Sequence, residues 1–360
     1  MNIRIFDRNV NLIAETDTYQ SLSFERKLFT AGVFKIKLNS NTLYADEFQK
    51  NRLVSIGNSG KKVGVIKQIQ HNIVNNTSIL EVTGVELKGI LQQRVTIPTA
   101  ASEFQSFTTT EAETIIKDVV TQNCITNYPF TNLNILTDYA RGDKFDYTTR
   151  YKPLESEIER IARLSKLGTS LTLNYATKKW DFDIILGNDL TSSGSSINPV
   201  IFAYEYGNIQ AQYYTESDFN SVNYAIVGGS GDGASRIIVE TGTTDTDIDL
   251  YIGFVEAGNL TDTDELTARG QETVSKLKPI QSFNCDILPV SNYEYETDYD
   301  LGDFVTMQDK TIGVSVDKQI EGITEYYDKT GFKITIDFGQ DLKTTRQIID
   351  EKMDNSKVVD

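Results

Sequence analysis

The chain has 360 residues, which is enough for two or three domains of ordinary size. Its 51 acidic and 35 basic residues give a formal net charge of −16, which argues against binding nucleic acid through the phosphates. The apolar run at 200–204, one of the longest, falls far below the roughly 18 residues that span a bilayer. No basic segment followed by an apolar stretch starts the chain, so we expect a soluble protein without a classical secretory signal.

Residues 1–98 have the pattern of an antiparallel sheet or barrel. Apolar and polar side chains alternate along 34–39, with the period of two that is typical of a half-buried strand. Two further strands are expected within 63–69 and 79–85. The polar stretch Asn75 to Ser78 between them predicts a hairpin turn.

Residues 99–198 are predicted to form an α+β domain. Its first segment, 99–110, is small and polar, and its threonines are expected to cap a following helix. The apolar face of that helix is formed by Ile115, Ile116, Val119 and Val120.

A second helix of this domain is expected after Pro153, with Gly168 just past its end. The side chains that face inward are Leu154, Ile158, Ile161, Ala162 and Leu164. Two strands follow at 171–175 and 180–184, joined by a turn at 176–179.

Strands dominate again in 199–360. The Ser- and Gly-rich segment Thr191 to Asn198 is the best candidate for a connection between domains. One further helix is expected at 264–278, where Pro279 stops it, and a charged helical stretch begins at Leu342. Because that stretch has few apolar positions, we expect it to be frayed or to be ordered by a partner.

Two distant segments, 53–69 and 304–320, show the same order of features. The first contains Leu53-Val-Ser-Ile, Lys61, Gly64-Val65 and Lys67-Gln-Ile69, and the second contains Phe304-Val-Thr-Met, Lys310, Gly313-Val314 and Lys318-Gln-Ile320. A β-hairpin is expected after each segment. The pattern indicates an internal duplication of one β-domain, and the alternative is a chance recurrence of short strand patterns.

Few residues of this chain can carry catalysis or hold a metal ion. His71 is the only histidine, which removes most catalytic triads and multi-histidine metal sites, and it is expected to be exposed on a strand. Cys124 and Cys285 are the only cysteines, too few and too far apart to indicate a disulfide framework or a zinc site. We expect both to be buried, in a reducing compartment.

The segment Gly228-Gly-Ser-Gly-Asp-Gly233 resembles a phosphate-binding loop, because glycines allow backbone amides to approach an anion. Apolar strands are predicted on both sides of it, so no helix N-terminus follows. A flexible hairpin is the favoured interpretation.

A second segment matches the carboxylate positions of a calcium loop, at Asp245, Asp247, Asp249 and Glu256. Leu250 stands where the sharp turn needs glycine, and 248–255 has the pattern of a strand. No local feature selects a pair of carboxylates at glycosidase spacing. We therefore predict no catalytic residue, no cofactor-binding residue, no metal ligand and no cofactor.

Six short segments, taken in order, are specific as a set although each one alone is weak. They are Ile3-Arg-Ile-Phe-Asp-Arg8, Gly32-Val-Phe34, Val63-Gly-Val-Ile-Lys67, Gly84-Val-Glu-Leu-Lys-Gly89 with Arg94 to Pro98, Lys179-Trp-Asp-Phe182, and Asp300-Leu-Gly-Asp-Phe-Val305. Through them the chain resembles the tail hub proteins of siphophages. That family also forms the N-terminal part of many tail-associated lysins and is similar to the hub of contractile-tail baseplates.

The resemblance implies a mainly β fold with two tail-tube-like β-barrel domains plus smaller α+β domains. The tube-like domains would be 1–98 and 199–360, the second with an α+β insertion and a C-terminal helix. The resemblance further implies a homotrimeric ring at the distal end of the virion tail, assembled in the host cytoplasm, in which three copies of two domains match a sixfold tube.

The partners that the resemblance implies are further copies of the chain, the distal tail protein, the tail tube protein, the tape measure protein and a fibre or receptor-binding protein. DNA would pass through the channel without specific binding. Lysin members carry an appended peptidase or glycosidase domain, whereas the hub-like part here runs almost to Asp360. We therefore expect a structural protein and no enzyme, with a tail-associated cell-wall hydrolase or a receptor-binding adhesin as the alternatives.

Overall fold

The computed structural model describes residues 1–99, 102–194, 198–288 and 291–339. It is mainly β, with 43% strand and 19% helix, which confirms the predicted class. Contacts divide the chain into unit 1, which comprises Met1–Gln212 and Asn284–Gly339, and unit 2, which contains Tyr213–Phe283. No helix in the described part is long and apolar enough to cross a membrane.

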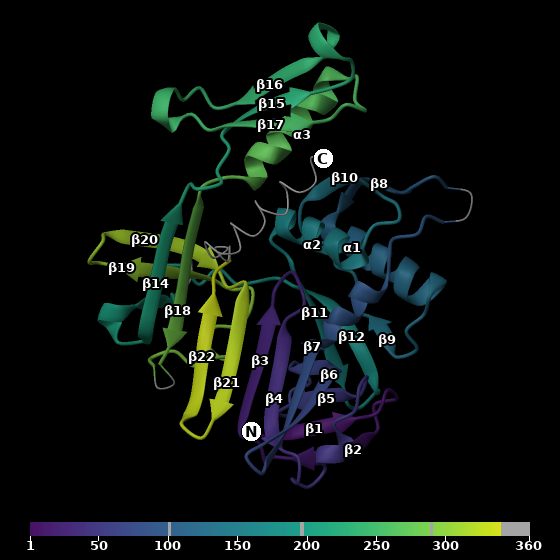
Figure 1. The fold of residues 1–360 in the computed structure, drawn as a ribbon, viewed down its shortest axis with the longest axis vertical. Helices are drawn as coiled ribbons and strands as arrows, with labels where there is room; N and C mark the ends of the chain where they lie inside the picture. Colours follow the sequence, from purple (N-terminus) through teal and green to yellow (C-terminus); the bar gives the residue numbers. More distant parts are fainter. Residues whose placement is uncertain (100–101, 195–197, 289–290, 340–360) are drawn as a thin grey trace. The chain divides into compact units, whose positions relative to one another are not determined.

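A sheet of eleven strands runs through unit 1 in the order β14-β18-β22-β21-β3-β4-β7-β6-β5-β1-β2 (Figure 1). Its strands are β1 (Ile3–Phe6), β2 (Leu12–Thr16), β3 (Ser21–Lys27), β4 (Val33–Asn39), β5 (Leu53–Ile56), β6 (Val63–Val74), β7 (Thr77–Glu86), β14 (Ile209–Ser217), β18 (Ile280–Ile287), β21 (Gly322–Asp328) and β22 (Gly331–Asp337). The order begins at β14 and ends at β2, so the described strands form an open sheet where closed barrels were predicted.

The strands β1 to β7 form what we call the first module. Phe34, Ile36 and Leu38 of β4 are fully buried while the residues between them are not, as the alternation predicted. The turn between β6 and β7 is shorter than expected. Asn75 and Asn76 both have positive φ, which suits a two-residue hairpin, and β7 begins directly after them.

The segment after the first module contains the two predicted helices and a small three-stranded sheet. Its elements are β8 (Gln105–Glu111), α1 (Ala112–Thr121), a π-helical turn (Gln122–Asn127), β9 (Leu133–Ile135), β10 (Lys144–Thr149), α2 (Leu154–Ser165), β11 (Gly168–Asn174) and β12 (Lys179–Ile185). The predicted apolar faces of both helices are buried, except that Leu164 is 59% exposed. That position was predicted wrongly because it lies beyond the buried stripe of α2.

The threonines near 105–111 do not cap α1. They form β8, which pairs with β10, and Glu111 takes the cap position without a side-chain hydrogen bond. Branching at Cβ favours extended backbone, which explains the difference. Helix α2 ends at Lys166, which takes a left-handed conformation, and Gly168, expected just past the helix end, starts β11.

The later strands of unit 1 form what we call the second module. They are β13 (Ile201–Ala203), β14, β18, β19 (Phe304–Asp309), β20 (Val314–Gln319), β21 and β22. Strand β19 pairs with β20 as β5 pairs with β6, and β21 pairs with β22 as β6 pairs with β7. A register shift interrupts β6 between Ile66 and Gln68. At the matching place in the second module, the extended segment is interrupted between the end of β20 and the start of β21.

The strand orders of the two modules therefore correspond. The first runs β3-β4-β7-β6-β5-β1, and the second runs β14-β18-β22-β21, followed by β20-β19-β13. One difference is that β13 is parallel to β19, whereas β1 is antiparallel to β5. Residues 218–279, which form most of unit 2, lie between β14 and β18, where the first module has only the short connection between β3 and β4.

Unit 2 contains a three-stranded sheet packed against one helix. Its elements are β15 (Tyr224–Gly228), β16 (Ile238–Gly242), β17 (Ile252–Glu256) and α3 (Thr263–Lys276). The core comprises Ala225, Val227, Ala257 and Leu266. Helix α3 confirms the helix predicted at 264–278, and the Asp262 side chain caps its first turn.

Short 3-10 turns occur at Ala45–Glu47, Leu87–Gln93, Tyr204–Tyr206, Gly233–Ser235 and Asp247–Asp249. The charged stretch predicted from Leu342 and part of the proposed connection at 191–198 lie outside the described residues. The division into three domains at 98 and 198 stays a prediction.

Candidate assembly surfaces

The predicted reactive side chains do not come together. His71 is exposed on β6, as expected, and its Nε2 lies 2.7 Å from the Ser78 Oγ of β7. Cys124 and Cys285 are free and buried, as expected. Burial raises the pKa of the Cys124 thiol to about 12, so this thiol stays protonated and is not a nucleophile at neutral pH.

The glycine-rich loop connects the antiparallel strands β15 and β16, as the hairpin interpretation predicted. The amide of Gly229 donates to Ile237 O at 2.8 Å, and the amide of Ser230 donates to Leu260 O at 2.8 Å. These two amides are therefore already satisfied within the protein.

The aspartates of the calcium-like segment do not converge on one point. Asp247–Asp249 lie in a 3-10 turn and β17 begins at Ile252, so the predicted strand at 248–255 starts later than expected. The Asp245 carboxylate accepts from a threonine hydroxyl, while Glu256 pairs with an arginine. Within the described ranges, no group of three or more His, Cys, Asp or Glu side chains could hold a metal ion.

The two modules are joined edge to edge where β3 pairs antiparallel with β21. Seven residue pairs form this junction, from Gly322 with Lys27 to Asp328 with Ser21. Figure 1 shows the purple strands of the first module beside the yellow strands of the second in one sheet. Backbone pairing thus makes a single surface from segments about 300 residues apart in sequence.

Buried ion pairs lie beside this junction, each with its cation in the first module and its acid in the second. Lys62 Nζ lies 2.6 Å from a Glu325 carboxylate oxygen, and Glu325 is only 1% exposed. The hydroxyls of Tyr295 and Tyr327 also donate to Glu325, at 2.9 and 2.6 Å. Arg26, which is 6% exposed, pairs with the carboxylate of Asp300.

The geometry of this network makes it sensitive to the loss of any one partner. Burial alone would raise the pKa of Asp300, but the Arg26 guanidinium and the backbone amide of Leu301 hold it below its ordinary value. The effect is largest for Glu325, because removing the partner of a fully buried charge is strongly destabilising.

Among the described strands, the sheet has open edges at β14, at β2 and along the distal half of β6. Strand β14 is the first in the order, so only β18 flanks it. Strand β6 pairs with β7 along 64–74, but with β5 only at 63–65. Its distal half is exposed, and Ile73 is 70% exposed. In the second module, β21 has β3 at the corresponding edge.

The solvent face of the sheet is polar and its charges are paired. Lys35 and Lys37 of β4 lie 2.8 and 3.7 Å from the Glu81 carboxylate of β7. Lys333 of β22 lies 2.6 Å from Asp286 of β18. These three lysines are therefore neutralised by neighbouring carboxylates, which weakens their attraction for a polyanion.

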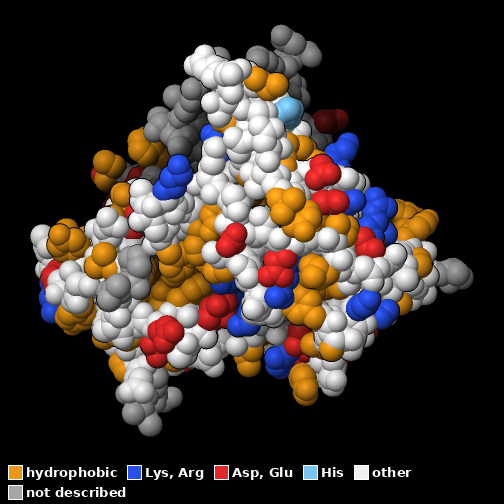
Figure 2. All heavy atoms as spheres, turned by 90° about the horizontal axis from the view of Figure 1, so that it is seen from below, with side chains coloured by type: hydrophobic (Ala, Val, Ile, Leu, Met, Phe, Trp, Pro, Cys, Tyr) orange, Lys and Arg blue, Asp and Glu red, His pale blue; other side chains and the backbone are white. Residues whose placement is uncertain are grey.

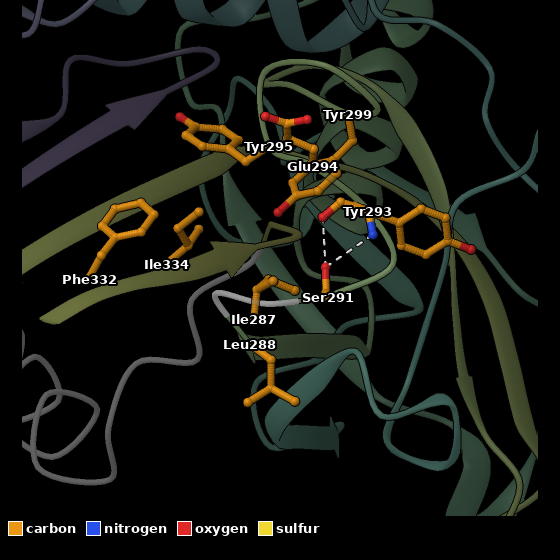
Figure 3. A pocket seen from close by; sticks show the side chains of 9 residues that line it. All are labelled: Ile287, Leu288, Ser291, Tyr293, Glu294, Tyr295, Tyr299, Phe332 and Ile334. Carbon is orange, nitrogen blue, oxygen red and sulfur yellow. Dashed lines mark hydrogen bonds between the residues drawn. The ribbon is translucent and has the colours of Figure 1, made fainter.

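A pocket of about 450 Å³ opens in the second module (Figure 3). It is lined by Ile287, Leu288, Ser291, Tyr293, Glu294, Tyr295, Tyr299, Phe332 and Ile334. We call it the tyrosine pocket. Figure 2 shows that hydrophobic side chains also gather in a hollow of the surface seen from below, with acidic and basic side chains around it.

The hydroxyls of the three tyrosines in this pocket differ in their partners. Tyr293 donates to Pro199 O at 3.2 Å, and Tyr295 donates to Glu325. The Tyr299 hydroxyl is buried and has no hydrogen-bond partner within the described part of the chain. Burying an unpaired hydroxyl costs free energy, so the Tyr299 hydroxyl is an unsatisfied hydrogen-bonding group at the wall of the pocket.

One family model, that of the Siphovirus ReqiPepy6 Gp37-like protein, matches residues 2–340. No curated protein sequence matches the chain. Among solved structures the chain is similar to the 43 kDa tail protein of prophage MuSo2 from Shewanella oneidensis, with 15% identity and a TM-score of 0.58 over 94% of this chain and 98% of that chain.

It is also similar to the tail protein from Neisseria meningitidis MC58, with 11% identity and a TM-score of 0.58 over 94% of this chain and 96% of that chain. A third similar structure is prophage tail protein gp18 from Listeria monocytogenes EGD-e, with 12% identity and a TM-score of 0.55 over 100% and 99%. At these identities the likeness shows a shared fold. Together with the family match it confirms the predicted resemblance to siphophage tail proteins. Because the family model covers nearly the whole sequence, the chain belongs to the Siphovirus ReqiPepy6 Gp37-like family.

Proposed function

We propose that the chain is a structural protein of a phage tail, and that it forms a trimeric hub ring at the distal end of the tail around the DNA channel. Membership of the family and the fold shared with three phage or prophage tail proteins support the structural role over an enzymatic one. Its partners would be tail components: the tube, the distal tail protein, the tape measure protein and a fibre or receptor-binding protein.

The pattern of paired and open strand edges is the observation that supports a ring. The junction of β3 with β21 uses two edges. The edges that correspond to them in the opposite module, β14 and the distal half of β6, are open among the described strands. An open edge presents unpaired backbone donors and acceptors to another strand. We infer that β14 of one copy pairs with β6 of the next, repeating between subunits the contact that joins the modules within one subunit.

A head-to-tail contact of this kind closes into a ring when the rotation between copies closes. Three copies would then supply six similar modules around one axis, which suits a sixfold tube. The three-domain division at 98 and 198 belongs to the same proposal, with one β-module in the first domain and one in the third.

The polar face of the sheet suits the wall of a channel through which DNA moves. Its lysines are paired with carboxylates, and the chain as a whole carries a net charge of −16. Such a wall attracts phosphate groups weakly, so a moving strand is not held.

Mass photometry of the purified chain tests the ring. We expect a species at about three times the subunit mass of 40.4 kDa, and negative-stain images of it should show an annulus. A strictly monomeric protein at micromolar concentration, together with tail tips that lack the corresponding density, would contradict the proposal.

Two adjacent proline substitutions in β6, Gln70→Pro and His71→Pro, test the edge pairing. Consecutive amides of a strand point to opposite sides, so one variant removes a bond to β7 and the other removes only an amide of the open edge. We expect the variant that loses only an open-edge amide to keep its unfolding temperature and to become monomeric. A trimer that persists in that variant would exclude pairing through this edge of β6.

A further inference from the structure

The tyrosine pocket occupies a position that the first module fills with its own chain. Phe48 stands five residues before β5, and Tyr299 stands five residues before β19, the strand that corresponds to β5. The two side chains are 3% and 2% exposed. Phe48 packs with Ala45 in the main core of the first module, whereas the described residues around Tyr299 leave a pocket beside it.

The difference between these two residues is a hydroxyl. Tyr299 packs edge-on against Phe202, with ring centroids 5.2 Å apart, so its ring is held as a core residue would be. Figure 3 shows its hydroxyl directed into the space bordered by Ile287 and Ile334. A phenylalanine here would leave a purely apolar wall, so the hydroxyl adds a hydrogen-bonding group that the fold of this subunit does not use.

We propose that the tyrosine pocket takes an aromatic side chain from another tail protein, and that a small displacement of the pocket wall on binding lets the buried Tyr299 hydroxyl donate to a backbone carbonyl of the same segment. This inference rests on the proposed function, since it assumes that the chain docks other tail components. A space of about 450 Å³ holds one aromatic side chain together with part of its backbone. The rings of Tyr295 and Phe332 suit an aromatic guest through edge and face contacts.

An acidic side chain at the pocket favours a basic residue next to the aromatic residue of the partner segment. Glu294 lines the pocket and is exposed, so its carboxylate can meet a basic side chain beside the aromatic one. The net charge of −16 favours the approach of a basic partner over an acidic one. The proposed occupant is therefore a basic segment of a second protein that presents one aromatic residue.

A dipeptide probe, N-acetyl-lysyl-phenylalaninamide, tests the pocket by saturation-transfer NMR on the full chain. We expect transfer to the phenyl protons in the wild type, and none to the alanine counterpart N-acetyl-lysyl-alaninamide. Ile334→Trp fills the pocket and should abolish the transfer.

Tyr299→Phe removes one hydrogen bond and should weaken binding by about 2- to 10-fold. Ile252→Trp, the same change at an exposed isoleucine that does not line the pocket, should have no effect.

Absence of transfer in the wild type, or transfer that survives Ile334→Trp, overturns the proposal. So does a lowered melting temperature of Tyr299→Phe, because it would show that the hydroxyl is already bonded within the protein. Mass photometry of the same samples separates this inference from the ring. If Ile334→Trp changes the oligomer distribution, the occupant is a second copy of the chain, and the proposed partner is wrong. A monomeric wild type that still binds the probe contradicts only the ring.

Discussion

The first module closes its interior with its own side chains, whereas the second module keeps an open pocket at the matching place. In the first, the ring of Phe34 lies so close to Gly64 and Gly84 that a Cβ at either position would come within about 2.5 Å of it. In the second, Tyr299 packs against Phe202 on one side and borders free space on the other. One strand order thus supports either a closed core or an open pocket.

The edges of the two modules differ in a complementary way. Strand β21 of the second module is paired on both sides, while the corresponding part of β6 is paired only with β7. Strand β3 of the first module is paired on both sides, while β14 has only β18. Each module therefore lacks the neighbour that the other one has, and a further copy of the chain can supply it.

The largest expected effect concerns the ion pairs at the junction. Glu325→Gln leaves Lys62 without its nearest carboxylate in a buried site, and we expect a loss of about 3 to 5 kcal/mol in the free energy of unfolding. Urea denaturation measures it. The matched control is Glu81→Gln on the solvent face of the sheet, where loss of the pairs with Lys35 and Lys37 should cost less than about 1 kcal/mol. Equal losses in the two variants would mean that the junction network has no special role.

Exchanging the two equivalent aromatic residues tests whether the pocket is a real difference between the modules. Phe48→Tyr buries a hydroxyl in a filled core and should destabilise the chain by about 1 to 3 kcal/mol. Tyr299→Phe removes a buried hydroxyl that has no partner in the described structure and should stabilise the chain by about 1 kcal/mol. Thermal unfolding of both variants gives the answer, and the reverse ranking would contradict the assignment of open and closed modules.

The smallest effect is a dependence on pH. Because the folded state holds the pKa of Asp300 below its ordinary value, this carboxylate stabilises the protein above about pH 4 and loses that contribution as the pH falls through the folded pKa. Comparing wild type and Asp300→Asn between pH 7 and pH 2.5 isolates it. The Asp300 side chain is 29% exposed, and Arg26 still donates to the Tyr295 hydroxyl in the variant. We therefore expect the variant to be less stable by about 1 kcal/mol at pH 7 and to converge with the wild type in acid. Parallel stability curves would exclude a contribution from this group.

Local patterns predicted much of the secondary structure because their causes are local. The alternation along 34–39 follows from the pleat of a strand with one buried face, and the apolar stripes of α1 and α2 follow from the helical repeat. Departures arose where two local preferences compete. The threonines of β8 can cap a helix or extend a strand, and pairing with β10 decides between the two.

The repeated segments at 53–69 and 304–320 were visible in the sequence, but their meaning depended on contacts that no local pattern encodes. Pairing of β3 with β21 joins residues about 300 positions apart, and the tyrosine pocket exists only because segments from β18, β22 and the loop around Tyr299 meet. The sequence by itself determined which segments become strands and helices, through side-chain alternation and turn residues. Tertiary structure decided which strand edges are covered and which hydroxyl lacks a partner, since both depend on which distant segments become neighbours.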